Sequence, residues 1–247
     1  MRKILVTILS LFIFSKAQAA QSPSVLVYNV TTDTVVEQFN ANVVRPIASI
    51  TKLMTAMVAL DYYNLDQKLK TNKKQTEQVG VLLTSLLVRS DNSAAEVLAK
   101  NYPGGRAAFI SAMNIKATQL NLEQTKFIDP SGMGVFNIST ANELVELLVH
   151  AYRYNFIRTV ANQPEIYTVV KTKYGYKERP VYTSTSKALL SEFDNIVLTK
   201  TGYTSRAGRC IILMVEKAGQ MQAIVILGEP TKQQRDSLAR QLIAQNS

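Results

Sequence analysis

The chain has 247 residues, of which 47% are hydrophobic and 19% charged, and its formal net charge is +10. This length and composition suit a globular protein with a sizeable core and exclude collagen-like, coiled-coil and disordered chains. One cysteine, Cys210, and one histidine, His150, exclude a disulfide framework and argue against a zinc site, a cysteine–histidine pair or a Ser-His-Asp triad. Catalysis would therefore depend on hydroxyl, lysine, carboxylate and amide groups, with no cofactor and no metal expected.

Residues 1–19 are typical of a secretory signal peptide. Arg2 and Lys3 form a basic start, residues 4–14 are apolar, and residues 17–19 form a small-x-small cleavage signal. The apolar run is too short to span a membrane, so we predict export to the periplasm, with an uncleaved anchor as the alternative. A basic exported protein suits an anionic envelope polymer. No basic run alternates with aromatic residues, so nucleic acid is not an expected partner.

Strand-like segments lie at both ends of the remaining chain, and helical periodicity fills its middle. The predicted strands are 24–30, 35–39, 195–201, 210–215 and 222–227, and the predicted helices are 51–62, 82–89, 93–101, 106–120, 140–154 and 235–245. This order predicts one sheet built from the two chain ends, with helices inserted between them. We expect one domain, 20–247, with a sheet subdomain (20–47 and 190–247) and a helical subdomain (48–189).

A first candidate motif, Ser49-Ile50-Thr51-Lys52, opens the first predicted helix. A serine hydroxyl is a poor nucleophile until a neighbouring base removes its proton, and helical spacing lets Lys52 reach the Ser49 hydroxyl. If Ser49 begins the helix, its backbone N–H is free to donate to a developing oxyanion. A helix N-cap with a solvated lysine explains the motif equally well, and the same spacing recurs at Ser184-Thr185-Ser186-Lys187.

A second motif, Ser90-Asp91-Asn92, stands between two predicted helices. All three residue types favour helix N-caps, which alone would explain it. In a catalytic site the Ser90 hydroxyl could relay a proton, and the Asn92 amide could bind a substrate carbonyl. Taken alone, this motif favours the N-cap interpretation.

A third motif, Lys200-Thr201-Gly202, closes the predicted strand that starts at Asn195. A glycine at a strand end often marks only a bulge or a turn. In a binding site, Lys200 and Thr201 could hold an anionic group, and the missing side chain of Gly202 would let a ligand lie along the strand. This motif alone also leaves both interpretations open.

Together the three motifs, in this order, form the set shared by penicillin-binding proteins and serine β-lactamases. The repeat at 184–187 does not fit the set, because it follows the second motif. Further matching stretches are 48–57, 102–105, 129–132, 139–141 and 198–202. Over nearly all of the chain after the signal peptide, it resembles a low-molecular-mass penicillin-binding protein of the D-alanyl-D-alanine carboxypeptidase/endopeptidase family, closest to the penicillin-binding protein 7 type of endopeptidase.

The resemblance implies a mixed α/β (α+β) fold, an antiparallel sheet flanked by helices. It implies hydrolysis of D-Ala-containing peptide bonds in peptidoglycan, with β-lactams as covalent inhibitors. The catalytic residues it implies are Ser49 as acylated nucleophile, Lys52 as its base, and Ser90. The substrate-binding residues it implies are Asn92, Lys200, Thr201, Gly202, Tyr203 and Arg235, and the oxyanion hole would be the backbone N–H groups of Ser49 and Tyr203. Burial and the charge of Lys200 are expected to lower the pKa of Lys52.

Two departures from the family bear on specificity. The segment between Leu69 and Leu82 is shorter than in relatives, where a hairpin-like excursion lies near the site. The chain also ends after its last predicted helix, so no further β-domain or amphipathic membrane anchor is expected. Both features favour cleavage of cross-links over release of terminal D-Ala.

Three alternatives stay open. A class A β-lactamase needs a glutamate that activates the deacylating water, and no E-x-x-L-N stretch follows Ser90 at a suitable distance. A D-alanyl-D-alanine carboxypeptidase would use the same residues on a terminal bond. A non-hydrolytic penicillin or peptidoglycan sensor would be acylated and stop at that stage.

Overall fold

The structure of the chain is a computed structural model that describes residues 22–72, 74–172 and 175–245. The predicted signal peptide, residues 1–19, lies outside the described residues. Within the described part, no helix is both long and apolar enough to cross a membrane.

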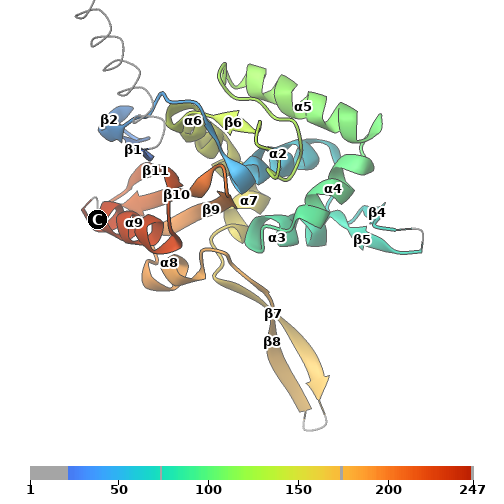
Figure 1. Ribbon diagram of the computed structural model, residues 1–247. Coiled ribbons are helices and arrows are strands. Elements are labelled where there is room, and N and C mark those ends of the chain that lie inside the picture. Colours follow the sequence, from blue (N-terminus) through green and yellow to red (C-terminus); the bar gives the residue numbers. More distant parts are fainter. Residues whose placement is uncertain (1–21, 73, 173–174, 246–247) are drawn as a thin grey trace, which may run out of the picture.

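A five-stranded antiparallel sheet joins the two ends of the chain (Figure 1). Its order is β2-β1-β11-β10-β9, where β1 is Ser24–Asn29, β2 Thr34–Phe39, β9 Ile196–Thr204, β10 Gly208–Lys217 and β11 Gln220–Glu229. The register pairs Leu26 with Val225 and Ile212 with Lys200. The prediction of one sheet built from both chain ends is confirmed, and β9, which carries the third motif, is an edge strand.

Alternating side chains of these strands enter two separate hydrophobic cores, as the two-residue period of a strand requires. On β10, Ile212 and Met214 pack into the larger core with the central helices. Their neighbours Ile211 and Leu213 pack on the opposite face, against α8 (Lys187–Glu192) and α9 (Lys232–Gln245). Apart from the exposed edge strand β2, the sheet is therefore buried on both faces, which fixes the position of β9 beside the helical part of the molecule.

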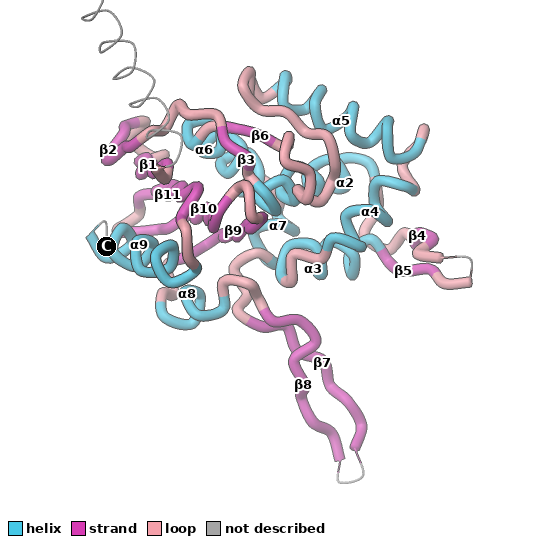
Figure 2. The backbone as a smooth tube through the Cα atoms, in the orientation of Figure 1, coloured by secondary structure: helices cyan, strands magenta, loops and turns pink. Residues whose placement is uncertain are grey.

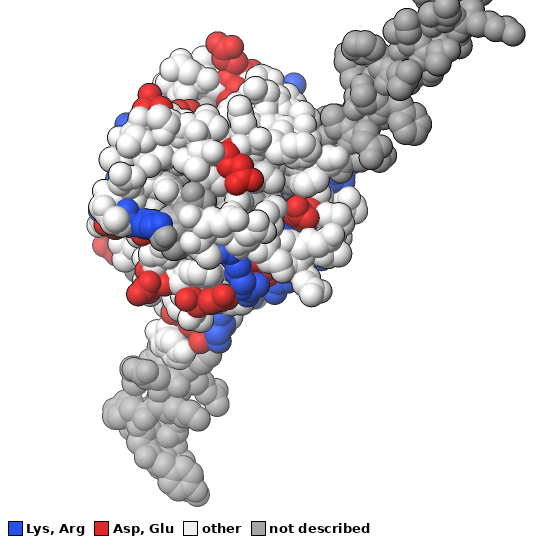
Figure 3. All heavy atoms as spheres, turned by 90° about the vertical axis from the view of Figure 1, so that its left-hand side faces the viewer, with Lys and Arg blue, Asp and Glu red and all other residues white. Residues whose placement is uncertain are grey.

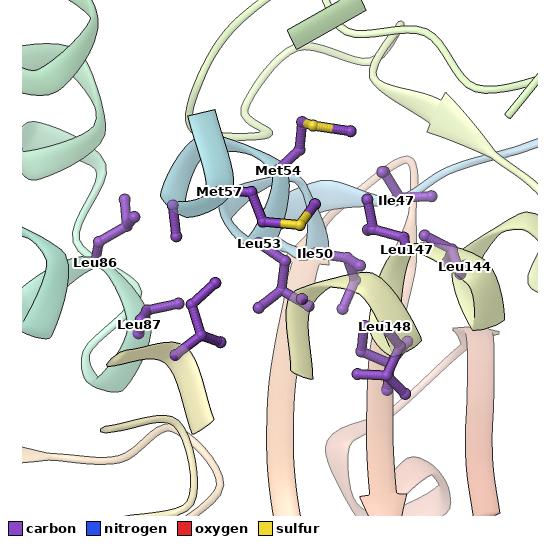
Figure 4. Packing of buried hydrophobic residues seen from close by; sticks show 14 of the residues in the cluster. Ile47, Ile50, Leu53, Met54, Met57, Leu86, Leu87, Leu144, Leu147 and Leu148 are labelled. Atoms are coloured by element: carbon purple, nitrogen blue, oxygen red, sulfur yellow. The ribbon is translucent and has the colours of Figure 1, made fainter. Parts of the chain in front are cut away.

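The helical part is built around α2 (Lys52–Tyr62), which is buried along most of its length. The surrounding helices are α3 (Val79–Val88), α4 (Asn92–Lys100), α5 (Gly105–Gln119), α6 (Ala141–Tyr152) and α7 (Asn155–Val160). Figure 4 shows Leu53 and Met57 of α2 between leucines of α3 and leucines of α6. A helix apolar on all sides belongs in a core. Its first residue, Lys52, is thereby held inside the protein.

Several short elements were not predicted (Figure 2). They are β3 (Arg45–Pro46) paired with β6 (Ile138–Ser139), β4 (Lys68–Lys70) paired with β5 (Thr76–Gln78), α7, α8, and the projecting hairpin of β7 (Glu165–Thr172) and β8 (Gly175–Thr183). The β4–β5 hairpin shows that the segment around Leu69 still forms a short hairpin, and that it is shorter than in relatives stays a prediction. Asn72 makes this turn possible, because its side chain donates to Gln75 and accepts from the Lys74 backbone.

On the face that Figure 3 shows, positive charge is not collected into one patch. In Figure 3, which presents the left-hand side of Figure 1, Lys and Arg groups lie interspersed with Asp and Glu groups. Arg240 and Glu192, for example, form an ion pair at 2.6 Å. This view therefore shows no continuous basic surface.

Candidate active site

The centre of the site is the contact between Ser49 and Lys52. Ser49 lies in a 3₁₀ turn, η1 (Ala48–Thr51), which runs directly into α2. The Lys52 Nζ donates to Ser49 Oγ at 2.9 Å, to Asn92 Oδ1 at 2.7 Å and to the carbonyl oxygen of Ser131 at 2.5 Å. An ammonium group has three protons, and all three have an acceptor here.

Burial sets the proton affinity of Lys52. Its side chain is fully buried, and desolvation lowers its pKa to about 8, although the carboxylates of Asp129 and Asp91 act in the opposite direction. A neutral amine is therefore accessible near neutral pH, as a general base requires. The charge of Lys200 was expected to lower the pKa of Lys52, but it is not among the causes of that shift. Instead, burial, and then the charges of Lys52 and Arg235, lower the pKa of Lys200.

In the second motif, one residue caps a helix and the other two contact the buried lysines of the site. Asp91 is the N-cap of α4 and accepts hydrogen bonds from the backbone of Ser93 and Ala94. Ser90 has a φ of 61°, and its Oγ accepts from the Lys200 Nζ at 2.9 Å. Asn92 begins α4 and faces Lys52. The N-cap explanation thus holds for Asp91, whereas Ser90 and Asn92 contact the two buried lysines.

The third motif passes close to η1. Lys200 is 1% exposed, and its Nζ also donates to the Thr201 carbonyl oxygen at 2.9 Å. A Cβ on Gly202 would lie 2.9 Å from the Ile47 carbonyl oxygen and 3.1 Å from the Ser49 backbone nitrogen, so only glycine fits here without a shift. This approach sets the Ser49 amide beside the edge strand that carries Tyr203.

A pocket of about 430 Å³ opens above these groups. The predicted site residues that line it are Ser49, Ser90, Thr201, Gly202, Tyr203 and Arg235, and the others are Ser184, Thr185, Arg209 and Lys232. Lys52 and Lys200 lie buried beneath it, and Asn92 lines a neighbouring cavity instead. The structure therefore brings all the predicted site residues to one region.

The repeat at 184–187 contributes to the pocket in a different way from the first motif. Thr185 Oγ1 accepts a hydrogen bond from Thr201 Oγ1 at 2.7 Å. Lys187 forms an ion pair with Glu165 at 3.0 Å. The Lys187 amine is thus engaged with a carboxylate, while Lys52 has no carboxylate among its hydrogen-bond partners.

Sequence reasoning assigned no role to the loop that holds Lys52 from the other side. Asp129 accepts from the backbone N–H groups of Ser131, Gly132 and Gly134, and this folds the loop so that the Ser131 carbonyl faces Lys52. Burial raises the pKa of Asp129, but these hydrogen bonds outweigh it and lower the pKa overall. Asp-Pro-Ser-Gly is a strong turn signal, which could have identified the loop but not its contact.

The same loop is tied to the start of α2. The Asn137 side chain donates to Thr51 Oγ1 at 3.0 Å and to the Asp129 carbonyl oxygen at 2.8 Å. Gly132 has a φ of 83°, and a Cβ there would overlap the Ala48 carbonyl oxygen at 1.9 Å. These contacts fix the loop against the turn that carries Ser49.

The sequence matches a family model and is similar to curated proteins of bacteria. A family model described as D-alanyl-D-alanine carboxypeptidase matches residues 13–77 and 63–231. A D-alanyl-D-alanine endopeptidase from Escherichia coli is 37% identical over 226 residues, 83% of this chain and 71% of that protein. One from Pseudomonas aeruginosa is 37% identical over 216 residues, 79% of this chain and 67% of that protein.

Solved structures show the same architecture. Penicillin-binding protein D2 from Listeria monocytogenes, in its ampicillin-bound form, superposes with a TM-score of 0.77 at 27% identity, covering 92% of this chain and 96% of that one. A Streptomyces DD-transpeptidase superposes with a TM-score of 0.79 at 26% identity, covering 89% of this chain and 94% of that one. These similarities confirm the predicted fold class.

Proposed function

The chain belongs to the D-alanyl-D-alanine carboxypeptidase family, and from this premise we propose that it cuts D-Ala–diaminopimelate cross-links of peptidoglycan in the periplasm through an acyl-enzyme on Ser49. It is a serine-type DD-peptidase with the fold of the penicillin-binding proteins. The observation that carries the proposal is the buried Lys52 amine in hydrogen-bonding contact with the Ser49 hydroxyl. The naming of its 37% identical relatives as endopeptidases supports cleavage of cross-links.

Acylation begins when Lys52, in its neutral form, takes the proton of Ser49 Oγ. The oxygen attacks the carbonyl carbon of the D-Ala residue, and the N–H groups of Ser49 and Tyr203 donate to the oxyanion of the tetrahedral intermediate. The scissile C–N bond then breaks, and its nitrogen needs a proton to leave as an amine. The Ser90 hydroxyl, which accepts a hydrogen bond from Lys200, gives its own proton to that nitrogen and takes one in turn from the Lys52 ammonium. Lys52 is thereby neutral again, and the proton removed from Ser49 is balanced by the one delivered to the leaving group.

The charge of Lys200 and the Thr201 hydroxyl suit the carboxylate that lies next to the scissile nitrogen. Arg235 reaches the same pocket from α9, held by hydrogen bonds from its Nε and Nη2 to Asp236 at 2.8 and 2.5 Å. The Asn92 amide binds the acyl part of the substrate. Water then attacks the ester on Ser49 while Lys52 accepts its proton, and Lys52 returns this proton to Ser49 Oγ as the ester C–O bond breaks, which restores the free enzyme.

A β-lactam offers the same groups as the peptide: a carbonyl for Ser49 and a carboxylate beside the nitrogen of the bond that opens. We therefore expect penicillins to acylate Ser49. The ampicillin-bound structure of the Listeria relative is consistent with this expectation.

Digestion of purified sacculi tests the proposal. The protein without residues 1–19 is incubated with sacculi, and dimeric and pentapeptide-containing muropeptides are followed by chromatography, with Ser49→Ala as the control. We expect dimers to fall and monomers to rise for the wild type only. Shortening of pentapeptides with persistent dimers would make the chain a carboxypeptidase, and acylation by penicillin without any muropeptide turnover would make it a sensor.

A further inference from the structure

The pocket above Ser49 holds more positive charge than one substrate carboxylate requires. Among the described residues that line it, Arg209, Lys232 and Arg235 are cationic, and no aspartate or glutamate is among them. Arg235 is already paired with Asp236 behind the pocket. In the described part of the chain, none of the ion pairs includes Arg209 or Lys232. Among the described residues, neither cation therefore has an ion-pair partner, although Glu229 of β11 is a cross-strand neighbour of Arg209.

Arg209 is held in a fixed orientation. It is the cross-strand partner of Tyr203, and its guanidinium carbon lies 3.5 Å from the centre of the Tyr203 ring. Stacking on a ring pre-orients the planar fork of donors with which arginine binds carboxylates. The Arg209 Nε is buried and has no hydrogen-bond partner among the described residues. A buried donor without a partner carries a free-energy cost, and the guanidinium that bears it lines the pocket that a ligand would enter.

Lys232 faces the same pocket from α9. It is the first residue of that helix and precedes Arg235 by three positions, so the two side chains share one helix face. Arg235 is 4% exposed and Lys200 is 1% exposed, whereas Lys232 is exposed and Tyr203 is 49% exposed. The cations thus form two levels: Lys200 and Arg235 at depth, and Arg209 and Lys232 at the rim.

The two possible substrates differ in the number of carboxylates beyond the scissile bond. A terminal D-Ala leaving group has one, next to the nitrogen that is released. A cross-link releases a whole stem peptide, which bears that same carboxylate next to the nitrogen and at least one more at a greater distance. The deep level of cations suits the first carboxylate, which leaves the rim cations Arg209 and Lys232 available to a second one.

We propose that Arg209 and Lys232 form a subsite for the second carboxylate of the leaving stem peptide, and that this subsite makes the pocket selective for cross-links. The inference rests on the proposed function and names residues that decide its specificity. Arg209 supplies the oriented fork of donors, and Lys232 supplies a mobile charge at the pocket entrance. Neither residue takes part in bond breaking.

The test compares three reactants for the wild type, Arg209→Gln, Lys232→Gln and the double variant. They are a cross-linked muropeptide dimer, a monomeric pentapeptide and benzylpenicillin, the last two having a single carboxylate beyond the scissile bond. Loss of one charge-assisted contact is expected to lower kcat/KM for the dimer about tenfold. We expect the dimer to lose at least five times more than penicillin acylation does. Lys68→Gln, an exposed lysine of β4, controls for net charge.

A dimer whose leaving stem carries amides in place of its distant carboxylates gives a matched substrate control. The wild type should cut it about as slowly as the double variant cuts the natural dimer. Equal losses on dimer, pentapeptide and penicillin, or full dimer activity in the double variant, would overturn the subsite. A wild type that leaves dimers intact would instead refute the proposed function, and the subsite with it.

Discussion

The floor of the pocket, where Lys52 and Lys200 lie buried, differs from its rim, where Arg209 and Lys232 lie, in whether the protein itself supplies partners for the positive charges. On the floor, all three protons of Lys52 have protein acceptors, and the loop behind it is tied down by Asp129 and Asn137. At the rim, Arg209 and Lys232 have no ion-pair partner in the described part of the chain. A pre-organised floor is suited to the bond-breaking step, which depends on position, whereas an unpaired rim is suited to an anionic ligand. The residues of the floor are thus suited to the chemical step, and those of the rim to the choice of substrate.

Replacing the nucleophile gives the largest effect on the floor. Ser49→Ala should abolish covalent labelling by a fluorescent penicillin, because no other described hydroxyl accepts a hydrogen bond from Lys52. Circular dichroism should show an intact fold. Ser184→Ala is the matched control, since Ser184 lines the same pocket and starts the repeated motif. Labelling that survives in Ser49→Ala and disappears in Ser184→Ala would show that Ser184, and not Ser49, is the nucleophile.

The two buried lysines should differ in how much they matter. Lys52→Ala removes the general base and the group that orients Ser49, so acylation should fall by about three orders of magnitude. Lys200→Ala removes attraction for the carboxylate and the contact with Ser90, and its effect should be about tenfold smaller. Stopped-flow acylation rates measured across pH compare the two. Identical losses at every pH would contradict this division of roles.

The pH dependence should report the burial of Lys52. The amine is active when neutral, and burial lowers its pKa to about 8, so the acylation rate should rise with pH and level off above that value. The rate should fall about tenfold for each unit below it. The measurement is the second-order rate constant for penicillin between pH 5.5 and 9.5, limits chosen to bracket that pKa. A rate that keeps rising up to the ordinary lysine pKa would mean that Lys52 is not desolvated.

Weakening the loop of residues 129–134, which lies behind Lys52, should have the smallest effect on acylation. Asp129→Asn removes the charge that accepts the backbone N–H groups of Ser131 and Gly132. We expect acylation to fall about tenfold and the melting temperature by a few degrees. Asp66→Asn, at an exposed position, makes the same charge change and should alter neither. Loss of stability with unchanged acylation would show that the loop does not position Lys52.

The same stabilisation should depend on pH. The folded-state pKa of Asp129 is lowered, so its contribution is present above the ordinary aspartate pKa and is lost as pH falls through the folded value. Acid unfolding of wild type and Asp129→Asn should therefore converge at low pH. Curves that stay parallel down to the acid transition would refute this linkage.

The sequence predicted those parts of the molecule that local patterns encode. Nearly continuous apolar runs in 210–215 and 222–227 identified central strands, because each face of these strands meets a separate core. The three motifs identified Ser49, Ser90 and Lys200 because their chemistry lies in short, contiguous segments. The domain boundaries and the roles of these residues stay predictions.

Features that depend on long-range contacts could not be predicted. The hydrogen bond from Lys52 to Ser131 spans 79 residues, and no local pattern reveals it. The β7–β8 hairpin pairs chiefly with itself and is not part of the five-stranded sheet that the two chain ends form. Pairing of Arg209 with Tyr203 follows from the register of β9 and β10, which periodicity does not fix.

The location of the acyl group tests the account most directly. The protein is incubated with benzylpenicillin, digested, and mapped by mass spectrometry for a peptide that has gained the mass of the drug. The account predicts one adduct, on the peptide that contains Ser49, and its loss in Ser49→Ala. An adduct on Ser184 or Ser90, or an unmodified protein after prolonged incubation, would contradict it.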